Sequence, residues 1–218
     1  MDAIFFDLDG TLVDSAPEIR ECLLESLREQ AVPLSAEAAS RFQVGPPLDA
    51  MIRVMAPLLS DDVVRAVVGS FRARYDRSDF LRTLPFPGVD ELLHMLAGEG
   101  IPLYVATNKP LYASTRIVQK KGWRCFDAIL SPDSESGKFM TKAQMLQRCA
   151  AEHAYCPRRC VLVGDLPDDV EAARKAGFLS VCAGWGYGDT AKRANWGADW
   201  IIDAPADLLT MLRTLRNV

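Results

Sequence analysis

IFFDLDGTLVDS, residues 4–15, joins an apolar run typical of a buried strand to two aspartates that are separated by one leucine. Asp7 and Asp9 would share roughly one side of the chain while it stays extended, because side chains alternate in direction along a strand. Burying two carboxylates next to each other costs free energy unless a positive group lies between them. The stretch therefore predicts a charged site at the end of the first strand, with a cation supplied from elsewhere.

The amino-acid composition limits the classes of protein to which this chain can belong. The chain has 218 residues, of which 49% are hydrophobic and 25% charged, as in ordinary globular proteins. A net charge of −4 argues against a nucleic-acid or membrane-surface partner. No apolar run is long enough to cross a bilayer, and the N-terminus lacks the features of an export signal, so we expect a cytoplasmic protein.

Short apolar runs alternate with helical patterns over most of the chain. The predicted strands are 3–6, 103–106, 128–130, 160–163, 180–182 and 200–202, and helices are expected near 89–98, 111–121, 142–153, 168–176 and 205–215. Continuous apolar strands alternating with helices predict a parallel sheet covered on both faces. We therefore expect an α/β fold with a doubly wound parallel sheet, whose ligands bind at the carboxyl ends of the strands.

One interval interrupts this alternation. Residues 15–83 contain no convincing strand, only helical patterns near 17–30, 36–43, 47–56 and 61–77. The rigid turn Pro85-Phe86-Pro87-Gly88 follows. We predict a core domain made of residues 1–14 and 84–218, with a helical domain of residues 15–83 inserted into it.

Polar side chains follow four of the predicted strands. They are Asp7 and Asp9 after the first, Thr107 and Asn108 after the second, Lys138 and Lys142 after the third, and Asp165, Asp168 and Asp169 after the fourth. The carboxyl ends of parallel strands open on one edge, so these groups should meet. Clustered carboxylates suit Mg²⁺, and a threonine, a lysine and backbone N–H groups suit a phosphate.

The two aspartates of the opening stretch have distinct expected roles. Asp7, at the strand end, can attack phosphorus and form an aspartyl-phosphate. Asp9 can give a proton to the leaving alcohol and then take one from the water that hydrolyses the intermediate. The alternative is that both acids only cap the following helix.

The lysine of the site is either Lys142 or Lys138. Thr141 would cap a helix over residues 142–153 and would bring the Lys142 ammonium to the edge of the cleft, so Lys142 is preferred. Lys138 lies in the loop SESGK, residues 134–138, and remains the alternative. Separate substitution of each lysine distinguishes the two.

The motifs together resemble the haloacid dehalogenase superfamily of phosphatases. They are DLDGTLVDS (7–15), TN (107–108), a lysine before a helix, and GDLPDD (164–169). The phrases VGPPL (44–48), FRARY (71–75), TLPFPGV (83–89), TNKP (107–110) and WGYGD (185–189) look most similar to its phosphoglycolate-phosphatase-like branch. The resemblance spans essentially the whole chain and implies a helical cap over an α/β core.

The resemblance also implies a role for each matched residue. Asp7 would be the nucleophile and Asp9 the general acid/base, while Thr107 and Asn108 orient the phosphoryl group. The Mg²⁺ ligands would be Asp7, the backbone carbonyl of Asp9, and Asp165, with Asp169 holding a metal-bound water or the lysine. Gly45 lies in a loop similar to the family's substrate-specificity loop, or in an ordinary turn. Neither Lys138 nor Lys142 has the proline of the family's frequent Lys-Pro-x-Pro run.

The expected activity is that of a Mg²⁺-dependent phosphatase acting on a small phosphorylated metabolite similar to phosphoglycolate. Asp9 argues against dehalogenation, and the absence of lysine from residues 16–84 argues against a phosphonatase. A sugar-phosphate mutase and a nucleotide or pyrophosphate hydrolase of the same superfamily stay open. A phospho-accepting receiver module is disfavoured by the helical insertion and by the DxDGT motif. The sequence does not distinguish a monomer from a homodimer.

Overall fold

The computed structural model describes residues 1–135 and 139–216, and its central feature is a parallel sheet. The sheet has six strands in the order β5-β4-β1-β6-β7-β8. Their bounds are β1 Ala3–Phe6, β4 Leu103–Ala106, β5 Ala128–Leu130, β6 Cys160–Gly164, β7 Leu179–Ala183 and β8 Trp200–Ile202. The predicted α/β fold with a parallel sheet is confirmed.

The first strand lies at the centre of this sheet. Phe6 is paired with Val105 of β4 on one side and with Val163 of β6 on the other. The residues that follow these three strands therefore lie at one edge of the sheet. This register brings the loops after β1, β4 and β6 together, which is where a doubly wound sheet binds its ligands.

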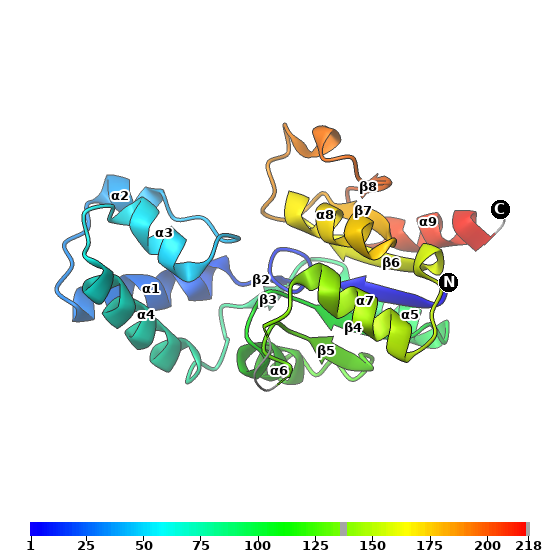
Figure 1. Cartoon of the computed structure of the whole chain (residues 1–218), viewed down its shortest axis with the longest axis horizontal. Helices are drawn as coiled ribbons and strands as arrows, with labels where there is room; N and C mark the ends of the chain where they lie inside the picture. The colour runs from blue at the N-terminus through cyan, green and yellow to red at the C-terminus, as the bar shows by residue number, and fades with distance from the viewer. Residues whose placement is uncertain (136–138, 217–218) are drawn as a thin grey trace. The chain divides into compact units, whose positions relative to one another are not determined.

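Helices cover both faces of the sheet (Figure 1). They are α5 Val89–Gly98, α6 Leu111–Lys120, α7 Lys142–Glu152, α8 Pro167–Ala176 and α9 Asp207–Arg216. On one face, α7 and α8 pack with alternate strand residues such as Phe5, Tyr104 and Leu162 in one buried cluster. The intervening residues Ile4 and Val105 are equally buried, so the strands are apolar on both sides, as the sequence predicted.

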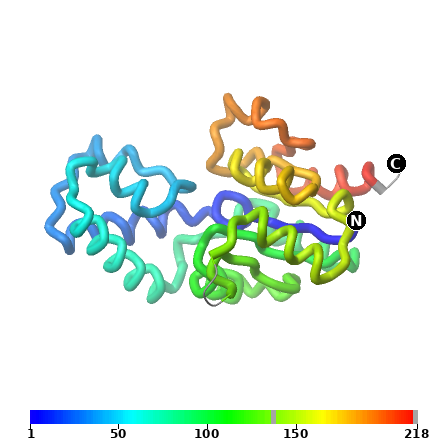
Figure 2. The backbone as a smooth tube through the Cα atoms, in the orientation of Figure 1, coloured from blue at the N-terminus to red at the C-terminus, as the bar shows by residue number. Residues whose placement is uncertain are grey.

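The chain divides into two compact units, one of Met1–Asp14 with Pro85–Val218 and the other of Ser15–Leu84. The second unit is helical, with α1 Ala16–Glu29, α2 Ala36–Ser40, α3 Leu48–Met55 and α4 Asp61–Tyr75. Figure 2 shows the blue part of the chain running into these helices and the chain returning from them in green. Two short strands, β2 Val13–Asp14 and β3 Leu84–Pro85, pair with each other.

The helical unit has its own core, and three of its helices, α2, α3 and α4, are shorter than predicted, α2 by the most residues. Helix α1 buries Leu23 and Leu27, and α4 buries Val67 and Phe71. Helix α2 ends at Ser40, because the N–H groups of the next two residues bond to carbonyls three residues back, which tightens the last turn. Across the described residues, no helix is both long and apolar enough to cross a membrane.

Candidate active site

The side chains of Asp7, Lys142 and Asp169 meet at the carboxyl edge of the sheet. The Lys142 Nζ lies 2.9 Å from Asp7 Oδ1 and 2.5 Å from Asp169 Oδ1. All three side chains are at least nine-tenths buried. Asp7 follows β1, Asp169 lies in the first turn of α8, and Lys142 begins α7. The sheet thus places a buried ammonium group between two carboxylates from distant parts of the chain.

The helix that carries Lys142 begins with a capping box. The Thr141 side chain accepts a hydrogen bond from the Gln144 N–H at 3.3 Å, and Gln144 Oε1 accepts one from the Thr141 N–H at 2.9 Å. These reciprocal bonds satisfy donors at the helix start and fix its first turn. Lys142 therefore projects from a well-defined position. Lys138, the alternative lysine, lies outside the described residues.

Asp165 is fully buried beside this group. The Thr11 hydroxyl donates to its Oδ1 at 3.0 Å, and the Tyr187 N–H donates to its Oδ2 at 2.8 Å. The surrounding backbone leaves no room for side chains: a Cβ added to Gly10 would lie 2.3 Å from Asp165 Oδ2, and one added to Gly186 would lie 2.2 Å from Asp165 Cβ. Glycine at these positions lets two loops close around one carboxylate.

The acids of the cluster perturb one another. Burial raises the pKa of Asp7 to about 6, with Lys142 opposing the rise and Asp169 adding to it. Burial, and then the charges of Asp7 and Asp169, raises the pKa of Asp165 to about 8. Burial disfavours the charged form of Lys142, but Asp169 and Asp7 outweigh it and raise the pKa of the ammonium group above its ordinary value. The cluster carries more negative charge than one lysine neutralises.

The carboxylates fit a small divalent cation. One oxygen each from Asp7, Asp165 and Asp169 lies within 4.8 Å of the others. Oxygens on opposite sides of Mg²⁺ are about 4.2 Å apart, given bonds of about 2.1 Å, so small adjustments would bring these atoms into range. Hard carboxylate oxygens are also the ligand type that Mg²⁺ prefers. The donor set therefore suits the ion that the sequence predicted.

Asp9 lies outside this cluster and contacts a different lysine. Lys109 Nζ lies 2.8 Å from Asp9 Oδ2 and 3.1 Å from Asp9 Oδ1. The side chains are 7% and 17% exposed, respectively. When all four carboxyl groups are ionised, as metal binding requires, Asp7, Asp9, Asp165 and Asp169 face two ammonium groups. Two negative charges then remain, which one divalent cation would neutralise.

The turn after β4 carries the predicted phosphate-binding residues. Thr107 is buried, and its Oγ1 accepts a hydrogen bond from the Lys109 N–H at 3.2 Å. A hydroxyl that accepts this bond can still donate its own hydrogen to a phosphoryl oxygen. Asn108, next in the chain, is exposed. Both residues follow β4, as the sequence predicted, and the structure places this strand beside β1.

Two other residues from the sequence analysis do not join the cluster. Asp168 is exposed, so the structure favours a solvated position for it over a place in the cluster. Gly45 belongs to the helical unit, where it is exposed with a φ of 128°, a conformation that glycine adopts readily. Its role in substrate recognition stays a prediction.

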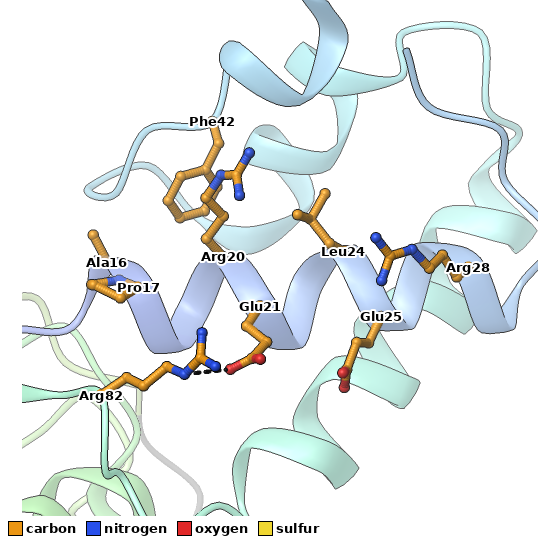
Figure 3. A pocket seen from close by; sticks show the side chains of 9 residues that line it. All are labelled: Ala16, Pro17, Arg20, Glu21, Leu24, Glu25, Arg28, Phe42 and Arg82. Carbon is orange, nitrogen blue, oxygen red and sulfur yellow. Dashed lines mark ion pairs between the residues drawn. The ribbon is translucent and has the colours of Figure 1, made fainter. Parts of the chain in front are cut away.

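The helical unit has a cavity of its own, of about 580 Å³. Figure 3 shows Arg20, Leu24 and Arg28 along one side of α1, with Phe42 from the loop after α2. The lining is completed by Ala16, Pro17, Glu21, Glu25 and Arg82. Arg82 pairs with Glu21, whereas Arg20 and Arg28 form no ion pair with the residues that the structure describes. The cavity therefore combines apolar surface with two cations available to an anion.

The sequence analysis missed two residues that contact the aspartates of the site, Lys109 and Thr11. Lys109 was visible within TNKP, two residues after Thr107, but no pattern indicates that its side chain reaches Asp9. Thr11 was visible within DGT, but its bond to Asp165 joins residues 154 positions apart. Such contacts depend on how distant strands align with each other in the sheet. By contrast, the local sequence is enough to predict that a residue lies at the end of a strand.

The chain was compared with known protein families and proteins. The family model for haloacid dehalogenase-like hydrolases matches residues 1–177. A phosphoglycolate phosphatase of Xanthomonas campestris pv. campestris is 33% identical over 208 residues, which cover 94% of each chain. The tyrosine-protein kinase PtkA of Mycobacterium tuberculosis is 32% identical over 185 residues, which are 85% of this chain and 62% of the kinase. A crystal structure of a predicted phosphoglycolate phosphatase from Haemophilus somnus superposes with a TM-score of 0.86, at 26% identity, over 97% of this chain and 98% of that one.

Proposed function

The chain belongs to the haloacid dehalogenase-like hydrolase family and is a phosphatase, and we propose that it hydrolyses a small phosphomonoester of the phosphoglycolate type in a Mg²⁺-dependent reaction. The observation that carries this proposal is the position of Asp7. Its Oδ1 is bound by Lys142, and its other carboxylate oxygen has no hydrogen-bond partner among the described residues. That oxygen can serve as a nucleophile toward phosphorus.

In the first step, the carboxylate of Asp7 attacks the phosphorus atom of the substrate. A bond forms between Asp7 and phosphorus, and the bond from phosphorus to the alcohol oxygen breaks. Asp9 donates a proton to that oxygen, which leaves as an alcohol. Lys142 and the hydroxyl of Thr107 bind the phosphoryl oxygens, whose charge they stabilise.

In the second step, the aspartyl-phosphate is hydrolysed. Water attacks phosphorus, and Asp9, now a carboxylate, takes the proton of the attacking water. The bond between phosphorus and Asp7 breaks, which releases inorganic phosphate and regenerates the Asp7 carboxylate. The same aspartate pair thus serves both halves of the reaction.

Mg²⁺ would be held by Asp7, Asp165 and the backbone carbonyl of Asp9, with Asp169 nearby. When bound, it neutralises negative charge and polarises the phosphoryl group. The bonds from Thr11 and Tyr187 hold Asp165 in one orientation, which supports its assignment as a ligand.

The cavity of the helical unit supports a substrate with a second anionic group. Arg20 and Arg28 offer guanidinium groups that bind carboxylates well. Phosphoglycolate carries a carboxylate beside its phosphoryl group, so a small phosphorylated acid fits this chemistry better than a neutral ester. We therefore propose, from the residues of this cavity alone, that the helical unit selects for an acidic substrate.

The test is a kinetic panel with purified protein, with and without Mg²⁺. The panel contains phosphoglycolate, a sugar phosphate, a nucleoside monophosphate, pyrophosphate and a tyrosine-phosphorylated peptide. We expect the highest kcat/KM for phosphoglycolate, and loss of turnover when EDTA removes the metal. Equal or greater activity on the other compounds would overturn the substrate assignment, and full activity in EDTA would overturn the metal requirement.

A further inference from the structure

Lys109 makes a contact that the steps above do not use. Its Nζ binds both carboxylate oxygens of Asp9, at 2.8 and 3.1 Å, across 100 residues of sequence. The lysine side chain is 7% exposed, so nearly all of its stem and its ammonium group are removed from water. Burying an ammonium group is costly, and an ion pair of this kind is weak grounds for inferring a contribution to stability.

Hydrogen bonds restrain the backbone of Lys109 at its N–H and at its carbonyl oxygen. Its N–H donates to Thr107 Oγ1 at 3.2 Å. Its carbonyl oxygen lies 2.7 Å from the Ser131 hydroxyl, which is shared with Asp133 Oδ1 at 2.6 Å. The Ser114 hydroxyl is 3.4 Å away and lies closer to the Pro110 carbonyl, at 3.0 Å. Because the side chain that projects from this turn is only 7% exposed, packing leaves it few alternative directions. The ammonium group is therefore presented to Asp9 from a rigid position.

Asp9 depends on this one partner. Lys109 is the only group that its side chain contacts by a hydrogen bond or ion pair within residues 1–135 and 139–216. The other buried lysine, Lys142, is shared by Asp7 and Asp169. Lys109 thus pairs with Asp9, whereas Lys142 pairs with Asp7 and Asp169, although Asp7 and Asp9 are only two residues apart.

We propose that Lys109 is the positioning residue of Asp9. It holds the Asp9 side chain away from Lys142 and the metal-binding carboxylates and aims it at the oxygen that leaves the substrate. Without Lys109, the strongest nearby attraction for a carboxylate would be Lys142 or a bound cation, and an aspartate drawn to them would be displaced from the leaving group. Lys109 keeps its own protons throughout, since the transferred proton belongs to Asp9. This inference rests on the proposed function, in which Asp9 is the proton donor.

The leaving group provides the test. Phenyl phosphate and p-nitrophenyl phosphate have similar shapes, but p-nitrophenolate leaves without a proton far more readily than phenolate does. Loss of a general acid therefore slows the hydrolysis of phenyl phosphate more than that of p-nitrophenyl phosphate. Such an acid contributes about 10²–10⁴-fold to the rate. We expect Lys109→Met to lower kcat/KM for phenyl phosphate at least about 10-fold more than for p-nitrophenyl phosphate. A structural defect would lower both by the same factor.

A double-mutant cycle shows whether Lys109 acts through Asp9. We expect Asp9→Asn to produce the same selective loss, and Asp9→Asn with Lys109→Met to be no worse than Asp9→Asn by itself. Lys109→Arg, which keeps the charge, should restore part of the kcat/KM that Lys109→Met loses for phenyl phosphate. Lys175→Met is the matched control, because Lys175 forms an exposed ion pair with Glu171 on α8. If Lys109→Met does not fold, the double variant, which removes both buried charges, and Lys109→Arg still provide the comparison.

The outcomes separate this inference from the proposed function. If Asp9→Asn shows no selective loss for phenyl phosphate, Asp9 is not the acid and the proposed function fails. Two results would overturn only the positioning role, provided that Asp9→Asn shows the selective loss for phenyl phosphate. One is that the Lys109 variants lower kcat/KM equally for both substrates. The other is that the effects of the Asp9 and Lys109 substitutions are additive. Selective and non-additive losses support both.

Discussion

Asp7 and Asp9 lie two residues apart at the end of β1, yet each binds a different buried lysine. In the proposed mechanism, this separation lets Asp7 act as nucleophile while Asp9 transfers a proton. Two identical side chains acquire different roles from their partners, since the environment of a carboxylate sets what it can do. The arrangement explains how this site can hold several acids so close together.

The pKa values of these acids predict how Mg²⁺ binding depends on pH. Burial raises the pKa of Asp165 to about 8 and that of Asp7 to about 6 in the metal-free protein. A metal binds the ionised carboxylates, so binding must release protons below these values. We expect Mg²⁺ affinity to increase as the pH rises from about 6 to about 8. Calorimetry in two buffers of different ionisation enthalpy measures the released protons directly.

The same shifts predict the stability of the metal-free protein. A carboxyl group whose pKa is higher in the folded state binds its proton more tightly when folded. Its contribution is therefore present at low pH and is lost as the pH rises from the unfolded value of about 4 through about 8. Asp165→Asn should flatten this decline in the unfolding free energy.

Mg²⁺ binding that is independent of pH over this range would contradict the assignment of Asp165 and Asp7.

At the scale of elements, the strand ends and helix starts bring the site together. Strand β6 ends at Gly164, and a Cβ added there would lie 2.3 Å from Asp169 Cγ in α8. We expect Gly164→Ala to displace Asp169, to weaken its bond to Lys142 and to destabilise the protein by about 1–3 kcal/mol. Turnover and urea unfolding measure the two effects.

Gly98→Ala is the control for this substitution. Gly98 ends α5, and nothing lies within 4 Å of a Cβ added there. Alanine favours helix more than glycine does, so stability should stay the same or increase by up to about 1 kcal/mol. Equal effects of the two substitutions would show that the close contact of Gly164 with Asp169 has no special role.

The sequence predicted the elements of the fold closely and the contacts between them less completely. Strands β1, β4, β5 and β8 begin and end at the predicted residues, because short apolar runs bounded by turns are local signals. The capping role of Thr141 was also predictable, since a cap depends on neighbouring residues. The pairing of Lys109 with Asp9 was not predictable, because it depends on the register of β4 beside β1.

At the scale of the whole molecule, the chain assigns different tasks to its two units. The α/β unit contains the acids and lysines that would act on the phosphoryl group in the proposed reaction, whereas the helical unit contains the cavity in Figure 3. A core that recognises only a phosphoryl group accepts many esters, so selectivity must come from other residues. We assign that selectivity to the helical unit, as proposed above.

Substitution of the cavity arginines tests this assignment. We expect Arg20→Ala with Arg28→Ala to raise KM for phosphoglycolate about 10-fold or more, because charged hydrogen bonds to the carboxylate are lost. The kcat/KM for p-nitrophenyl phosphate, which lacks a carboxylate, should change less than about 2-fold. Arg65→Ala is the control, since Arg65 forms an exposed ion pair with Asp62 in the same unit. Equal losses on both substrates would contradict recognition of the carboxylate.

The central claim, that a phosphoryl group is transferred to Asp7, has a direct test in the Asp9→Asn variant. This variant lacks the base for hydrolysis of the intermediate, so phosphorylated protein should accumulate when p-nitrophenyl phosphate and Mg²⁺ are added. Acid quenching, peptide digestion and mass spectrometry then locate the added group. The account predicts one phosphoryl group on the peptide that contains Asp7, and none when Asp7→Asn is also present. A phosphoryl group on another residue, or its persistence in the double variant, would contradict the account.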